Sequence, residues 1–146
     1  MRVMALDYGA KTVGVAISDP LGLTAQPVET IFRDSEESVK KSVARIKELV
    51  KENDISVIVL GFPKHLNNSE GLRCKKTIEF KDRLERNIKN VEITLWDERL
   101  TTKSSIQVLS GLSKKERDEV VDKAAATLIL QGFMQANSAM FNKNDI

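Results

Sequence analysis

Residues 2–18 read RVMALDYGAKTVGVAIS, two apolar runs separated by the short segment 8–11. Both runs are rich in the aliphatic and β-branched residues that strands favour. Gly9 suits a tight connection, so the pattern predicts a β-hairpin between residues 2–7 and 12–18. Asp7 closes the first run, at the point where the chain is about to turn.

Three later segments also have the composition of strands. Residues 26–33 predict a third strand, with Pro27 near its start, as strand prolines prefer. Residues 57–60 form a continuous apolar run that ends at Gly61, which is typical of a strand covered on both faces. Residues 91–96 alternate apolar with polar side chains and predict a fifth strand.

The segments between and after these strands have the pattern of helices. Apolar residues from Val39 to Val50 recur at helical spacing, and a capping-box pattern at residues 34–37 predicts where this helix begins. Further helices are predicted over residues 69–87, 101–111 and 114–136. The order of elements predicts an α/β fold with a mixed five-stranded sheet, an antiparallel three-stranded meander plus parallel strands, flanked by helices.

Three acidic residues fall where this topology would bring them together. Asp7 and Glu98 each follow a predicted strand, and Asp122 lies three residues before Ala125, on the inward side of the last helix. Taken singly, they are also typical of a turn, a surface ion pair and a solvated helix face. A cluster of carboxylates is costly unless a cation neutralises it, and hard cations such as Mg²⁺ prefer oxygen ligands. The coincidence predicts a two-metal site for phosphodiester chemistry, with Asp97 as an alternative to Glu98.

Polar and basic residues near these acids are candidates for phosphate contacts. The loop after residues 57–60 should lie at the ligand-facing edge of the sheet, where the N-terminus of the next helix favours an anion. A polar loop and a helix cap would have the same composition. The predicted substrate-binding residues are Lys11, Lys64, Asn67, Ser69, Arg73 and Arg99.

Size and composition favour an ordinary globular protein. The 146 residues, 41% hydrophobic and 30% charged, predict one domain over residues 1–138 and a C-terminal tail over residues 139–146. A net charge of +2 does not by itself indicate a nucleic-acid partner. The single cysteine, Cys74, excludes an intrachain disulfide. With no leader and no long apolar run, we expect a cytoplasmic protein without a membrane segment.

Several motifs together resemble the YqgF family, also called RuvX, of RNase H-like nucleases. The matching pieces follow one another in family order and lie within residues 6–9, 13–19, 61–64, 97–102 and 122–131. The resemblance implies an RNase H-like fold and assigns the metal site to Asp7, Glu98 and Asp122. The chain departs from the common family pattern at Thr12, Val13, Phe62, His65 and Asn68, which affects phosphate contacts rather than the acids.

The resemblance also implies an activity. The expected function is metal-dependent endonucleolytic hydrolysis of phosphodiester bonds, which processes the 5′ end of pre-16S rRNA with two Mg²⁺ or Mn²⁺ ions. The partner would be pre-rRNA or a pre-ribosomal particle, bound by a monomer or homodimer. Two alternatives stay open at this point: a Holliday-junction resolvase that acts on branched DNA, and a non-catalytic nucleic-acid-binding module.

Overall fold

The computed structural model describes residues 1–9, 11–34, 39–62, 68–97 and 114–137; for residues 68–70 and 114–123 it describes the course of the backbone only. The short helix predicted over residues 101–111 and the predicted tail lie outside the described residues. Among the described residues, no helix combines the length and the apolar composition that crossing a lipid bilayer requires.

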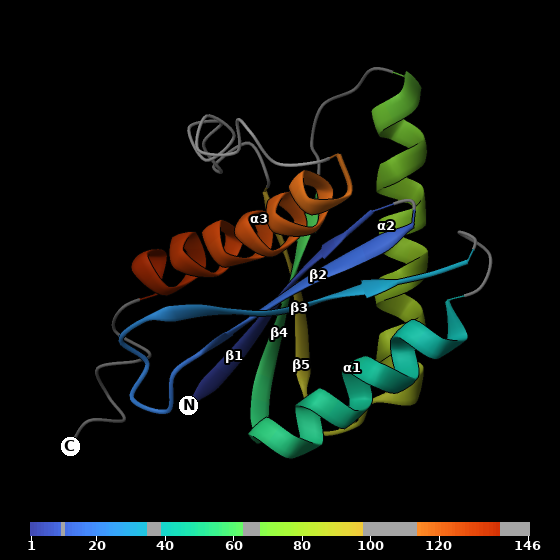
Figure 1. Ribbon diagram of the computed structural model, residues 1–146. Coiled ribbons are helices and arrows are strands. Elements are labelled where there is room, and N and C mark those ends of the chain that lie inside the picture. Colours follow the sequence, from blue (N-terminus) through green and yellow to red (C-terminus); the bar gives the residue numbers. More distant parts are fainter. Residues whose placement is uncertain (10, 35–38, 63–67, 98–113, 138–146) are drawn as a thin grey trace.

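Five strands form one sheet, and the predicted arrangement of the strands is confirmed. The sheet order is β3-β2-β1-β4-β5, with antiparallel pairing within β1–β3 and parallel pairing of β1 with β4 and of β4 with β5 (Figure 1). β1 therefore joins the antiparallel meander to the parallel half of the sheet. The strands are β1 (Arg2–Tyr8), β2 (Thr12–Ser18), β3 (Ala25–Phe32), β4 (Ile55–Phe62) and β5 (Glu92–Asp97).

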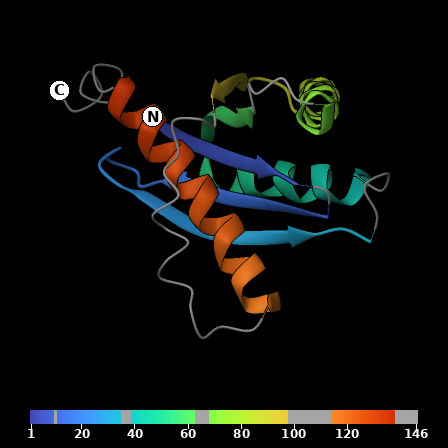
Figure 2. The ribbon, with the colours of Figure 1, turned by 90° about the horizontal axis from the view of Figure 1, so that it is seen from above.

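Helices cover both faces of the sheet, which makes a three-layer structure. Figure 2 shows α3 crossing one face and α1 and α2 on the other. Side chains from alternate positions of each strand supply the two cores. In β1, Met4, Leu6 and Tyr8 belong to the core under α1 and α2, whereas Val3 and Ala5 belong to the core under α3. The helices are α1 (Lys40–Asn53), α2 (Asn68–Asn87) and α3 (Lys114–Ala136).

The start of α1 is buried. The helix begins at Lys40, after the N-cap residue Val39, whereas residues 35–37 of the predicted capping box lie outside the described residues. Val39 provides no side-chain cap, but it is buried in the same core as Val43 and Ile46. Burial of this apolar face therefore stabilises the first turn of the helix without a side-chain cap from Val39.

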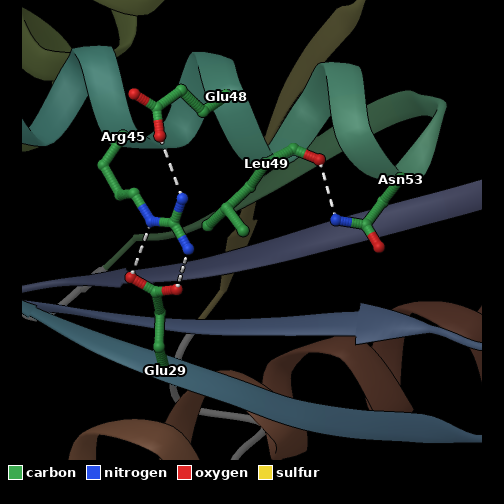
Figure 3. A network of polar contacts seen from close by, with 5 residues as sticks. All are labelled: Glu29, Arg45, Glu48, Leu49 and Asn53. Carbon is green, nitrogen blue, oxygen red and sulfur yellow. Dashed lines mark hydrogen bonds and ion pairs between the residues drawn. The ribbon is translucent and has the colours of Figure 1, made fainter.

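A charged contact joins α1 to the outer part of the sheet. The guanidinium of Arg45 donates two hydrogen bonds to Glu29 of β3, from Nη2 at 2.7 Å and from Nε at 3.1 Å, and a third to Glu48 at 3.0 Å (Figure 3). The hydrogen bonds to the Glu29 carboxylate raise the pKa of Arg45, so this group stays charged. Near the other end of α1, Asn53 Nδ2 donates to the Leu49 carbonyl at 2.9 Å (Figure 3).

Candidate functional site

Asp7 lies near the carboxyl end of the central strand, on the face covered by α3. The alternation of β1 decides this orientation, because Val3 and Ala5 pack into the α3-side core and Asp7 is the next residue in that series. The flanking residues Leu6 and Tyr8 face the opposite core. Asp7 is half-buried, so a carboxylate is positioned at the boundary between core and solvent.

The strand register shows how β5 approaches this position. Leu6 pairs with Leu60 and Leu60 with Leu95, so Asp7, Gly61 and Trp96 follow at one level across three strands. Neighbouring strands lie about 4.8 Å apart, which puts the Asp7 and Trp96 backbones about 10 Å apart. β5 therefore delivers its carboxyl end to the same edge of the sheet as β1.

Asp97 and Asp7 lie on opposite faces of the sheet. Ile93 belongs to the core under α1 and α2, and Leu95 packs against that core; Asp97 continues this series at the end of β5. A carboxylate on that face is directed away from the side on which Asp7 lies. Glu98, the residue that follows, lies outside the described residues.

α3 carries the third predicted acid across the Asp7 face. Ala126, Ile129 and Leu130 are fully or almost fully buried against Val3 and Ala5 of β1. Asp122 lies four positions before Ala126 and seven before Ile129, so its backbone position is on the sheet-facing stripe of the helix. The structure thus puts two of the three acidic positions, Asp7 and Asp122, on elements that pack together over one face.

The small residue Gly132 lets α3 pack closely against Trp96 of β5. A Cβ atom added at Gly132 of α3 would lie 3.3 Å from Trp96 Nε1, so the glycine leaves space for the indole ring. Trp96 also meets Phe133 edge-on, with 5.9 Å between ring centroids. This contact fixes the end of β5 against the helix that contains Asp122.

Two arginines hold the turn that follows Asp7. Arg33 donates from Nη1 to the Tyr8 hydroxyl at 2.9 Å and from Nη2 to the Gly9 carbonyl, and its guanidinium lies 4.5 Å from the centroid of the Tyr8 ring. Its backbone N–H also donates to the Lys11 carbonyl at 2.8 Å. Arg33 is 7% exposed, so these contacts form a buried polar network. No local pattern in the sequence marks Arg33, because its partners are more than twenty residues away.

Arg73, which is predicted to bind substrate, makes a contact with the backbone of β1. Its Nη2 donates to the Tyr8 carbonyl at 3.0 Å, although the side chain is otherwise exposed. Arg33 and Arg73 therefore bind the two successive carbonyls after Asp7, one from the end of β3 and one from α2. We interpret both as positioning residues for this turn.

The other predicted phosphate contacts are described only in part. Lys11 lies in the β1–β2 connection with an exposed side chain. Ser69 is the second residue of α2, and Figure 1 shows α2 running antiparallel to β4, so its N-terminus lies at the carboxyl edge, as predicted. Lys64, Asn67 and Arg99 lie outside the described residues. Within the described residues no group of three acidic, histidine or cysteine side chains forms a metal site.

The chain is similar to known proteins over most of its length. A family model described as RuvX, Holliday junction resolvase, matches residues 1–136. The chain belongs to the RuvX family. Two relatives, each named "Putative pre-16S rRNA nuclease", illustrate the similarity. The protein from Lachnospira eligens is 46% identical over 138 residues, 93% of this chain and 98% of the relative. That from Listeria innocua is 48% identical over 141 residues, 94% and 100% of the two chains.

Solved structures confirm the RNase H-like fold. Thermus thermophilus RuvC, determined in complex with a Holliday junction substrate, matches with a TM-score of 0.56 and 14% identity over 93% of this chain and 95% of RuvC. The fowlpox virus resolvase, in complex with Holliday junction DNA, matches with a TM-score of 0.51 and 15% identity over 93% and 98% of the two chains. At these identities the similarity establishes the fold alone.

Proposed function

We propose that this RuvX protein is a metal-dependent endonuclease that hydrolyses phosphodiester bonds in pre-16S rRNA during ribosome biogenesis. The observation that carries the proposal is the placement of Asp7, a half-buried carboxylate at the carboxyl end of the central strand, on the face that α3 crosses. The names of the relatives that match nearly their whole length support the same activity.

The proposed metal ligands are Asp7, Glu98 and Asp122, with Mg²⁺ or Mn²⁺ as the ions. Oxygen donors of this kind suit hard divalent cations, and Asp7 lies on the α3 side, where Asp122 lies on the sheet-facing stripe. The opposite orientation of Asp97 favours Glu98 as the acid contributed from the end of β5. When bound, two such ions would lower the pKa of a water molecule and neutralise charge on the phosphate.

The chain's own residues would orient the substrate. Arg33 and Arg73 fix the turn after Asp7 and so restrict the direction of its carboxylate. Lys11 lies in that turn with its ammonium group in solvent, where it would attract a phosphate. Lys64, Asn67, Ser69 and Arg99 complete the proposed set of phosphate contacts, and a cytoplasmic pre-ribosomal particle is the proposed setting.

The test compares cleavage by wild type, Asp7→Asn and a matched control. Asp82 is an exposed aspartate of α2, so Asp82→Asn removes the same charge away from the site. Each protein is incubated with Mn²⁺ or Mg²⁺ and a pre-16S rRNA fragment. We expect metal-dependent cutting by wild type and Asp82→Asn and none by Asp7→Asn, with unchanged circular dichroism. Full activity of a well-folded Asp7→Asn protein would exclude the assignment.

A second substrate distinguishes the proposed RNA nuclease from a Holliday-junction resolvase. The family description favours a resolvase, so the same proteins are tested on a synthetic four-way DNA junction. Symmetric cutting of the junction alone, by a dimer with two active sites, would replace the RNA substrate by branched DNA. Binding of RNA without cutting by well-folded protein would instead support a non-catalytic nucleic-acid-binding module.

A further inference from the structure

A cavity of about 350 Å³ lies between α2 and the residue that precedes α1. Tyr8 and Phe80 line it, with their rings stacked at 4.1 Å between centroids, and Val39 lines it from the side of α1. All three residues belong to the core under α1 and α2. The cavity is therefore on the face of the sheet opposite to Asp7, although Tyr8 is the next residue along the chain.

Basic side chains of α2 form the polar part of the cavity lining. Lys76, Arg83 and Arg86 contribute three positive charges, against the single negative charge of Glu79. Their spacing puts them along one stripe of the helix. From Lys76 to Arg86 the helix rises about 15 Å, a length that spans several phosphates of an extended strand.

Arg83 and Arg86 differ from the other described arginines in how the fold uses them. The side chains of Arg2, Arg33 and Arg73 donate to backbone carbonyls, and Arg45 pairs with two glutamates. In the described part of the chain, the guanidinium groups of Arg83 and Arg86 make no hydrogen bond or ion pair. These two arginines lie beside the stacked rings of Tyr8 and Phe80, and their N–H groups are available as donors. Such guanidinium groups are suited to bind phosphate oxygens.

We propose that this cavity is a second nucleic-acid contact site, which binds the phosphodiester backbone of a strand on the α2 side of the sheet. The nucleic-acid identity of the ligand rests on the proposed function. Because Tyr8 borders the cavity and Asp7 lies on the other face, a strand that passes the carboxyl end of β1 would contact both sites. The α2 site would hold the substrate beyond the bond that is cut.

The test measures how binding depends on salt. A fluorescent single-stranded RNA is titrated in EDTA, without divalent metal, at several salt concentrations, and a DNA strand of the same sequence forms a second arm. The variant is Arg83→Gln/Arg86→Gln. The control is Lys47→Gln/Lys51→Gln, which removes two exposed charges from α1, outside the cavity lining. Arg83→Lys/Arg86→Lys keeps the charges.

The slope of log affinity against log salt is negative, and losing two phosphate contacts should make it shallower by about 1.5. If the proteins bind alike at 1 M salt, this corresponds to a loss of about 30-fold at 0.1 M. The control should keep the wild-type slope, and the lysine pair should restore most of it. An equal change in slope with RNA and with DNA supports a site that binds the phosphate backbone. A change with RNA alone supports a site that also contacts the ribose.

An unchanged slope in the arginine variant, or an equal fall in the lysine control, would overturn the α2 site. So would the absence of any binding by wild type. These outcomes are independent of the cleavage assay. Cutting that depends on Asp7, together with an unchanged slope, would retain the nuclease and remove only the second site. A shallower slope in the arginine variant, without any cutting by wild type, would retain the second site and remove the nuclease activity.

Discussion

Replacing Arg33 by glutamine should destabilise the protein and disturb the turn beside Asp7. The substitution removes the guanidinium that bonds the Tyr8 hydroxyl and the Gly9 carbonyl and lies over the Tyr8 ring. A hydrogen bond from a charged donor contributes about 1.5–3 kcal/mol, and a cation–π contact about 1 kcal/mol. Since glutamine retains one such contact at best, we expect a loss of about 3 kcal/mol in the free energy of unfolding.

Urea denaturation and thermal melting measure this loss. For a domain of this size, 3 kcal/mol corresponds to a fall in Tm of about 10 °C. Arg45→Gln provides the control for charge, because Arg45 lies in a solvent-accessible ion pair with Glu29 and Glu48, which should contribute less to stability than the buried Arg33 network. Arg33→Lys keeps the charge but not the planar fork, so its stability should lie between wild type and Arg33→Gln.

Metal dependence separates positioning from stability. If the turn orients Asp7, Arg33→Gln at a temperature where it is fully folded should need more Mn²⁺ for half-maximal cleavage than wild type does. Stability within about 0.5 kcal/mol of wild type would refute the energetic reasoning, because a buried network of this kind cannot be lost without cost. A large loss of stability with unchanged metal dependence would leave Arg33 a structural role only.

Four further substitutions, at three positions, test other parts of the fold. Gly132→Leu should destabilise by about 2 kcal/mol and change tryptophan fluorescence, because even a Cβ would lie 3.3 Å from Trp96 Nε1. Gly132→Ala should be near neutral, since its gain of about 1 kcal/mol in helix propensity offsets the close contact. Leu60→Ala, at a fully buried position of β4, should cost about 3 kcal/mol in chemical denaturation. Hydrogen bonds from the backbone of Thr24, and also from Leu23 and Leu21, lower the pKa of Asp19 below 3.8. Its stabilisation should therefore be complete above that pH and lost as the pH falls through the lowered pKa, and Asp19→Asn should remove this dependence in acid unfolding curves.

The sheet could be predicted from the sequence because each strand is marked locally. Residues 2–18 alternate between faces on either side of a short connection, and residues 57–60 are apolar without interruption. Hairpin and crossover rules then determine the pairing. The exact start of α1 is harder to predict in this way, because the burial of Val39 depends on the sheet and on α2.

The candidate site was predictable only in part, for a similar reason. Asp7 is marked by its place at the end of an apolar run, and the phase of α3 places Asp122 on the sheet-facing stripe. Arg33 and the contact of Arg73 with the Tyr8 carbonyl depend on segments that meet only in the folded chain. The separation of Asp97 from Asp7 follows from the faces of their strands, which the sequence alone left open.

The place of α3 in the chain has a consequence for synthesis. One face of the sheet, with Val3, Ala5, Ala16, Val57 and Val59, is covered by residues 126–134 of α3. During translation the five strands are made first, and their apolar surface stays exposed to water until those residues have left the ribosome. Until then the nascent chain has only one of its two cores, and the hydrophobic burial that stabilises the sheet is incomplete. The second core, on the face of the sheet that carries Asp7, therefore forms only after α3 has been synthesised.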